Sequence, residues 1–156
     1  MELDRTDKRI LRILQENGRI SNQELADKVG LSPSPCLRRV KQLEDEGIIM
    51  GYTTLVNGAS LGLKMIALIQ ISMDRHTPDR FETFEKTIQQ YPQVLECILI
   101  TGQSADYQIK VIVEDMDEYQ DFLLNKITKI EGVSDVHSSF VLRQVVNTTA
   151  LPIPAS

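Results

Sequence analysis

The 156-residue sequence predicts an α+β protein in which an N-terminal helix-turn-helix precedes a ferredoxin-like βαββαβ domain. Three observations support this. Residues up to Gly47 show the apolar spacing of three short helices. From Lys64 onward, β-prone stretches alternate with helical ones in the order β-α-β, β-α-β. Residues 1–62 carry nine Lys/Arg and nine Asp/Glu, whereas residues 63–156 carry eight and thirteen, so the net charge of −5 comes from the second part.

The first two helices are predicted from apolar periodicity and end signals. One face of the first helix, over about residues 4–16, is apolar: Leu3, Ile10, Leu11 and Leu14. Gly18 lies just beyond its end. Ser21, with Glu24 three residues later, predicts a capping box that starts a second helix. Gly30 ends that helix, so a tight turn follows it.

A third helix is predicted over about residues 32–46. Ser32 is its expected cap, Pro33 suits a first helical position that needs no amide donor, and Gly47 ends it. One face is expected to be apolar: Cys36, Leu37, Val40 and Leu43. The opposite face is polar: Ser34, Arg38, Lys41, Gln42 and Asp45. Arg39 falls at the edge of the polar face.

The polar face of the third helix is suited to DNA. Between Lys28 and Lys41 the chain has four cations and no acid. Cations neutralise phosphates, helix N-termini fix register, and side chains on an exposed helix reach base edges in the major groove. The predicted DNA contacts are Ser21, Ser32, Ser34, Pro35, Arg38, Arg39, Lys41 and Gln42. For any single charged residue an ordinary solvated helix face is the better explanation, so the prediction depends on the whole set.

The remaining organisation follows from composition and turn signals. Residues 48–56 are β-prone and predict a small two-stranded wing or a strand that leads away. Residues 57–63 contain two glycines and no charge and are the expected linker. We therefore predict a DNA-binding domain over 1–56, a ferredoxin-like domain over 64–146 and a loosely ordered tail over 147–156. The expected strands of the second domain are 65–73, 94–101, 107–113 and 133–146.

The loop between the second and third expected strands, Thr101-Gly102-Gln103-Ser104-Ala105-Asp106-Tyr107, is a candidate binding site. Gly102 permits close approach to backbone amides, which can hold a carboxylate. Asp106 can hold an ammonium group, and neighbouring apolar side chains can receive a side chain. These are the three requirements of a free amino acid. The alternative for a glycine and an aspartate in a hairpin is a simple turn.

Other classes fit the sequence less well. No apolar run approaches the roughly 20 residues of a membrane span, and the charged N-terminus is not a secretory signal. Cys36 and Cys97 form no disulfide framework or metal cluster, which favours a cytoplasmic protein. His76 and His137 have no matching Cys or acid constellation, so no catalytic site, cofactor or metal is expected. An RNA-binding sheet needs exposed aromatic residues on its central strands, and the candidate strands offer only Tyr107.

Three stretches carry a resemblance to a known family: Leu3-Asp4-Arg5-Thr6-Asp7 through Gly18-Arg19-Ile20-Ser21, Gly30-Leu31-Ser32-Pro33-Ser34-Pro35-Cys36-Leu37-Arg38-Arg39-Val40, and Leu43-Glu44-Asp45-Glu46-Gly47-Ile48-Ile49. The chain resembles the leucine-responsive regulatory protein/asparagine regulator (Lrp/AsnC) family over nearly its whole length. The resemblance implies a winged helix-turn-helix whose third helix enters the major groove of double-stranded DNA. It also implies homodimers that assemble further into octamers, here with no membrane partner.

The second half is similar to the RAM (regulator of amino-acid metabolism) domain of that family, in which a Gly-x-x-Asp-Tyr loop binds an amino acid between dimers. Gly102, Asp106 and Tyr107 match that motif, although three residues separate Gly102 from Asp106 here. Thr128 and Ser139 align with effector-sensitive positions. The effector-binding residues implied are therefore Thr101, Gly102, Gln103, Ser104, Asp106, Tyr107, Thr128 and Ser139, with leucine or methionine as the effector. The alternative is an oligomeric, architectural DNA-binding protein that responds to no effector.

Overall fold

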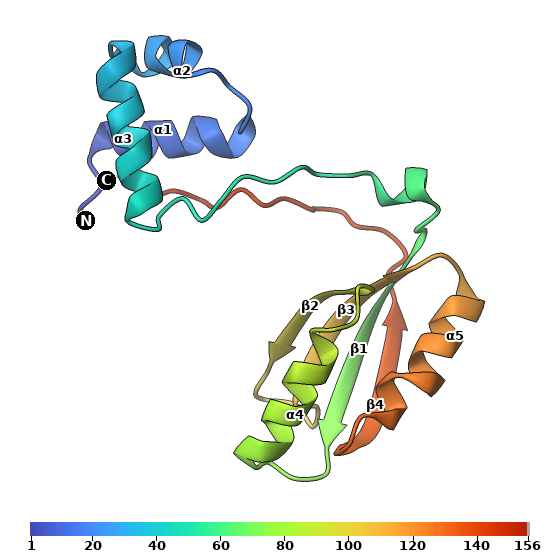
Figure 1. Cartoon of the computed structure of the whole chain (residues 1–156). Helices are drawn as coiled ribbons and strands as arrows, with labels where there is room; N and C mark the ends of the chain where they lie inside the picture. Colours follow the sequence, from blue (N-terminus) through green and yellow to red (C-terminus); the bar gives the residue numbers. More distant parts are fainter. Residues whose placement is uncertain (156) are drawn as a thin grey trace. The chain divides into compact units, whose positions relative to one another are not determined.

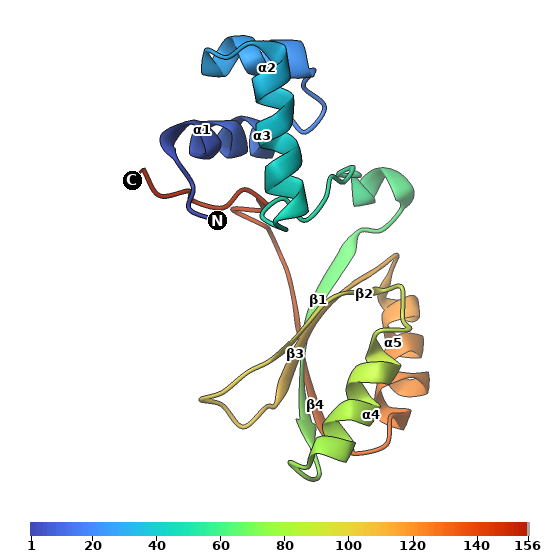
Figure 2. The ribbon, with the colours of Figure 1, turned by 60° about the vertical axis from the view of Figure 1, so that its left-hand side comes forward.

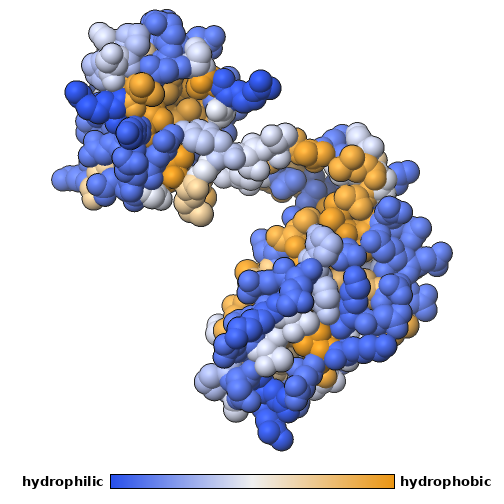
Figure 3. Space-filling model, in the orientation of Figure 1, coloured by the Kyte–Doolittle hydropathy of each residue, from blue (hydrophilic) through white to orange (hydrophobic). Residues whose placement is uncertain are grey.

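The computed structural model describes residues 1–155 and divides into two compact units (Figure 1). Met1–Leu55 and residues 146–155 form the first unit, and Val56–Val145 form the second. The chain therefore leaves the first unit, builds the second and returns. The segments that connect the units expose large apolar side chains (Figure 3): Met50, Tyr52, Leu55, Val56, Leu142, Val145 and Val146.

The first unit consists of α1 (Arg5–Glu16), α2 (Asn22–Val29) and α3 (Pro33–Asp45), in agreement with the three predicted helices. Its fully buried side chains come from all three: Ile10, Leu25, Ala26, Val29, Cys36 and Leu43. Gly30 adopts a left-handed conformation with φ 72°, which glycine permits, and turns the chain from α2 to α3. The arrangement is a helix-turn-helix in which α3 follows a short turn.

The helix caps differ from the predicted ones. A full capping box forms at α1, where Asp4 Oδ1 accepts from the Asp7 amide at 2.8 Å and Asp7 Oδ2 accepts from the Asp4 amide at 3.1 Å. At α2, Ser21 Oγ accepts from the Glu24 amide, which is half of the predicted box. Ser32 occupies the cap position of α3 but its side chain makes no capping bond. Pro35 is the third helical residue and has no N–H, so one of the two usual donors to a cap side chain is missing here.

Two expectations for the region around α3 are wrong. Leu37 was predicted in the apolar face, yet its side chain is 57% exposed. Residues 48–56 form no strand and hence no wing. The amides of Ile48 and Ile49 both donate to the Leu43 carbonyl, at 2.9 and 3.0 Å, so this segment first completes the end of α3 and then continues without strand pairing.

The second unit is the predicted βαββαβ fold. Its elements are β1 (Met65–Met73), α4 (Pro78–Ile88), β2 (Val94–Leu99), β3 (Tyr107–Val113), α5 (Met116–Asn125) and β4 (Val133–Phe140). The strands form one antiparallel sheet in the order β2-β3-β1-β4. Short 3₁₀ helices, η1 (Gly58–Leu61) and η2 (Ile127–Lys129), precede β1 and follow α5. Figure 2 shows α4 and α5 on the same face of the sheet.

The alternation of buried and less buried residues along β1 and β3 gives the sheet two different faces. One face packs on α4 and α5 around a buried core that includes Ile69, Ile71, Phe84, Tyr107 and Phe122. The other face, here called the open face, is covered by no helix of this unit. The register places Leu68 opposite Lys110 on one side and Ser139 on the other, so these residues form one row of the open face.

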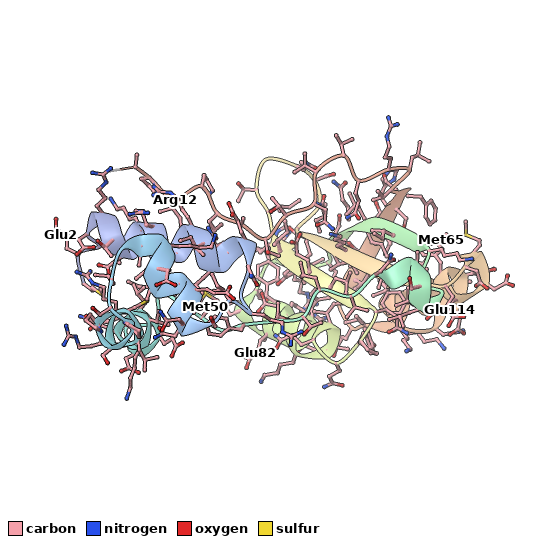
Figure 4. All side chains as sticks on the ribbon, turned by 90° about the horizontal axis from the view of Figure 1, so that it is seen from above. Glu2, Arg12, Met50, Met65, Glu82 and Glu114 are labelled. Carbon is pink, nitrogen blue, oxygen red and sulfur yellow. The ribbon has the colours of Figure 1, made fainter. Side chains whose placement is uncertain are left out.

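Three boundaries depart from the prediction. The expected linker, residues 57–63, contains η1 and belongs to the second unit. The last strand ends at Phe140 rather than at residue 146. The tail is not loose: Gln15 on α1 donates to the Leu151 carbonyl at 3.0 Å and accepts from its amide at 2.7 Å. Arg12, labelled in Figure 4, donates to the carbonyls of Ile153 and Pro154, both at 3.1 Å.

Candidate functional site

The exposed face of α3 gathers four of the eight predicted DNA contacts. Ser34, Arg38, Lys41 and Gln42 are all exposed on it, and we call this set, together with the exposed Leu37, the reading face. Residues three and four apart on a helix are neighbours, so Ser34 lies beside Arg38 and Arg38 beside Gln42. Five side chains of this face thus form one continuous surface, which carries two cations.

The start of α3 is fixed by a contact that the sequence analysis missed. The Asn22 side-chain amide, in the first turn of α2, donates to the Pro33 carbonyl at 2.8 Å. It joins the two helices of the motif beside the turn. Ser21 and Ser32, the cap residues of α2 and α3, are both exposed and lie at helix N-termini, where amides and the helix dipole favour a phosphate. Pro35 is half-buried.

Arg39 does not lie on the reading face. Its Nη1 contacts Asp4 Oδ2 at 2.7 Å and Asp7 Oδ1 at 2.9 Å, which joins α3 to the start of α1. These contacts raise the pKa of Arg39. The Asp7 amide, followed by Arg39, lowers the pKa of Asp4 below its ordinary value of 3.8. The Nη1 group of Arg39 is therefore used inside the unit, and a DNA contact through the rest of the guanidinium stays a prediction.

The end of α3 is held by the segment that follows it. The Tyr52 hydroxyl donates to Glu44 Oε1 at 2.9 Å, and burial, followed by this contact, raises the pKa of Tyr52 to about 12. Tyr52 also lies 3.5 Å from the position that a Cβ would take on Gly18, so it touches the turn after α1. The segment 48–56 therefore braces the helix-turn-helix although it forms no wing.

The predicted effector loop joins β2 to β3 and folds over the end of β1. Gly102 has φ 86°, as expected for a residue that needs glycine's freedom. The Gln70 side-chain amide donates to Gln103 Oε1 at 2.9 Å, and Ser72 Oγ donates to the Ser104 carbonyl at 3.3 Å. Because Gln70 and Ser72 are open-face residues of β1, the loop covers one end of the open face. Thr101, Gly102, Gln103 and Ser104 are all exposed.

Asp106 anchors the base of this loop. Its Oδ2 accepts from the Met73 amide at 2.7 Å, and its Oδ1 lies 2.9 Å from His76 Nε2. Its own amide donates to the Ile71 carbonyl at 2.9 Å. The side chain is 17% exposed, so the carboxylate keeps a solvent-facing part. A carboxylate has about four acceptor positions, and two of them are used here.

The other effector candidates are not brought together with the loop. Tyr107 is buried on the helix-covered face, where its hydroxyl donates to Glu85 Oε1 at 2.9 Å; burial, followed by Glu85, raises its pKa. Thr128 follows α5 and donates to the Leu124 carbonyl at 3.0 Å. Ser139 lies on the open face, opposite Leu68. A single chain therefore spreads the predicted set over both faces of the sheet.

Tyr107 also lines a cleft of about 430 Å³ between α4 and β2, with Glu85, Gln89, Leu95 and Cys97 among its other walls. Burial, followed by Glu85, raises the pKa of the Cys97 thiol to about 11, so the thiol stays protonated and unreactive.

Within residues 1–155, no group of His, Cys, Asp and Glu side chains is arranged to hold a metal ion. No helix in the same range is long and apolar enough to cross a membrane.

The open face lacks the stacking platform of an RNA-binding sheet. On the two central strands its residues are aliphatic, polar or charged: Ile66, Leu68, Gln70, Ser72, Gln108, Lys110 and Ile112. Tyr107, the aromatic residue that the sequence offered, points into the core. Base stacking on this sheet is therefore disfavoured.

A helix-turn-helix with an exposed cationic helix, followed by a sheet domain with an open face and a polar loop, defines a DNA-binding regulator with a separate ligand-binding domain. Residues 3–50 match the winged helix-turn-helix DNA-binding family, and residues 66–151 match the Lrp/AsnC ligand binding domain. The chain therefore belongs to the Lrp/AsnC family of transcriptional regulators.

Three relatives illustrate the similarity. The leucine-responsive regulatory protein of Escherichia coli is 41% identical over 97% of this chain and 92% of its own length. A transcriptional regulator from Neisseria meningitidis, solved as a complex with L-methionine, is 44% identical, with a TM-score of 0.93 over 97% of each chain. An AsnC family transcriptional regulator from Agrobacterium tumefaciens is 35% identical, with a TM-score of 0.91 over 96% of this chain and 97% of its own.

Proposed function

We propose that the protein is a cytoplasmic, sequence-specific transcriptional regulator without catalytic activity, whose assembly and DNA binding respond to a free amino acid, methionine or leucine, bound between dimers at the 101–107 loop. The observation that carries this proposal is the exposed polar loop at the end of the open sheet face, closed by Asp106. The Neisseria meningitidis relative, solved with L-methionine, supports methionine; the name of the curated relatives supports leucine.

The reading face alone gives weak binding. It offers two cations, Arg38 and Lys41, and the N-terminal amides of α2 and α3. Affinity for DNA grows with the number of phosphates that cations neutralise, so a single unit with two such cations should bind loosely. Two copies bound one helical turn apart, about 34–36 Å, would double these contacts on one DNA face. Strong binding therefore requires a device that pairs the units.

The open face supplies a surface for such pairing. It carries half-buried aliphatic residues next to charged ones, among them Ile66, Leu68 and Lys110. Apolar residues of the connecting segments, such as Leu142 and Met50, are also exposed. Surfaces of this kind mark interfaces. We propose that dimers form through the open face and assemble further into octamers.

The effector is proposed to bind hydrogen-bonding groups of the loop that have no partner within residues 1–155. Asp106 still offers acceptor positions for an ammonium group, and the exposed amides near Gly102 can hold a carboxylate. Thr128 follows α5 and Ser139 lies on the open face, and we propose that the two contribute to one site from different copies. Binding at a contact between dimers would shift the assembly state and so change how many reading faces engage one DNA segment.

A thermal-shift screen of the twenty amino acids tests the proposal. A ligand at 100 times its dissociation constant adds about 2.7 kcal/mol of stability, enough for a clear shift. The hit should then change both the size-exclusion profile and the DNA footprint. If no amino acid shifts the melting temperature, the profile or the footprint while DNA is still bound, the effector-independent architectural protein replaces the proposed sensor.

A further inference from the structure

Leu37 is out of place for a core residue. Periodicity predicts it on the apolar side of α3 with Cys36 and Leu43, which are fully buried, yet the Leu37 side chain is 57% exposed. It lies at the border of the reading face, next to the apolar side of α3. Residues three and four apart are neighbours on a helix, so Leu37 lies beside Ser34 and Lys41.

The N-terminal half of α3 offers few hydrogen-bonding groups. Over its first two turns, Pro33–Val40, the exposed residues that carry such groups are Ser34 and Arg38. The rest of this half is Pro33, Pro35, Cys36, Leu37 and Val40, apart from Arg39, whose guanidinium pairs with Asp4 and Asp7. In a helix-turn-helix it is this half of the second helix that contacts base edges. An exposed leucine there is placed to pack on an apolar group in the groove.

The major groove presents one apolar feature, the 5-methyl group of thymine. We propose that Leu37 packs on a thymine methyl and is a specificity-determining residue of this regulator, selecting a T·A pair in each half-site. Its neighbour Lys41 holds the adjacent phosphate backbone, which brings the leucine side chain down to the base edge. This inference deepens the proposed DNA-binding function and depends on it.

The experiment uses the full-length chain and DNA in which single methyl groups are removed. A preferred duplex is first selected from a randomised pool with the wild-type protein. Each thymine is then replaced singly by uracil, which removes the methyl and keeps every hydrogen-bonding group, and the dissociation constant is measured at one fixed salt concentration. We expect one thymine per half-site whose replacement weakens binding about fourfold, the factor for one buried methyl-sized group.

Leu37→Ala should weaken binding to the thymine duplex and abolish the uracil penalty at that position, whereas Leu37→Met, which keeps an apolar side chain of similar reach, should retain it. Leu124→Ala is the matched control, because Leu124 is an exposed helical leucine of the second unit, and should keep the full penalty. The coupling between protein and DNA changes isolates the contact from any general loss of affinity.

Two results overturn the inference alone. One is a uracil penalty of the same size in wild type and Leu37→Ala. The other is a preferred duplex in which no thymine methyl matters to the wild type. Selection that yields no preferred sequence, while salt-dependent binding persists, contradicts sequence-specific recognition itself and the inference with it.

Discussion

Arg39 holds α3 against the start of α1 in this domain. Arg39→Met tests whether the side chain has this structural role or contacts DNA. The side chain is 32% exposed, and it pairs with Asp4, which is 53% exposed, and with Asp7, which is 4% exposed. The contact to Asp4 is solvent-screened and contributes about 0–1 kcal/mol. Loss of the contact to Asp7 leaves Oδ1 of a buried carboxylate without its partner, which costs about 1–3 kcal/mol. Oδ2 keeps its bond from the Asp4 amide.

We therefore expect Arg39→Met to lower the free energy of unfolding of the first unit by about 2 kcal/mol. This makes the unfolded population of that unit roughly 30-fold larger. Hydrogen exchange followed by mass spectrometry measures this on the full chain. The most protected amides of α1 and α3 should exchange about 30-fold faster, while the strands of the second unit serve as an internal reference. Asp7→Asn in the Arg39→Met background should recover part of the loss, because it removes the unpaired buried charge.

Arg38→Met is the matched control, because Arg38 is the exposed neighbour on the reading face. It should leave exchange unchanged and reduce the slope of log affinity against log salt by about 1, as expected when one phosphate contact is removed. Arg39→Met should leave that slope unchanged. Normal exchange in Arg39→Met combined with a reduced salt slope would refute the framework role and restore Arg39 as a DNA contact.

Three further predictions concern a capping acid, the tail and the effector loop. The pKa of Asp4 is lowered in the folded state, so the stability that its carboxylate contributes is complete above the ordinary value of 3.8 and is lost as the pH falls through the lower folded value. Asp4→Asn should therefore make the stability of the first unit depend less on pH below about pH 4. Far-ultraviolet circular dichroism during acid titration measures this. Gln15→Ala removes both bonds to Leu151 and should speed carboxypeptidase digestion of the tail severalfold, and an unchanged digestion rate would argue against docking of the tail. Asp106→Asn keeps an oxygen for the Met73 amide but removes the charge, so it should lose the amino-acid response while retaining dimers and basal DNA binding. Asp106→Ala should lose the response and also loosen the loop. An undiminished amino-acid affinity of the Asn variant in calorimetry would contradict the role of the charge.

The parts of the fold that sequence predicts well are those set by neighbouring residues. The three helices of the first unit end at Asn17, Gly30 and the Glu46-Gly47 pair, close to the expected positions, because periodicity and turn residues act within a few positions. The same holds for the alternation of Tyr107–Val113, which is buried at every second residue. Local signals therefore determine the element order and the fold class.

Contacts between distant residues escape such signals. Periodicity puts Arg39 at the edge of the polar face of α3 and says nothing of its partner Asp7, which lies 32 positions earlier. The tail is predicted to be loosely ordered because it contains two prolines, yet Leu151 bonds to Gln15, 136 positions away. Prolines remove donors but leave carbonyls free, and Arg12 and Gln15 use these carbonyls. Local sequence patterns do not predict how a helix packs against a segment that is distant in the chain.

The predicted effector residues show the same limit for contacts between copies of the chain. The loop is built within one chain, since Gln70, Ser72 and Met73 of β1 hold Gln103, Ser104 and Asp106. Thr128 follows α5, Ser139 lies on the open face, and Tyr107 faces the core. If all of these residues act on one ligand, a monomer cannot form the complete site. Effector binding and assembly would then be linked necessarily, because the ligand stabilises only the states in which copies complete its site. The weak reading face is consistent with this arrangement, since only assembled copies would hold DNA firmly.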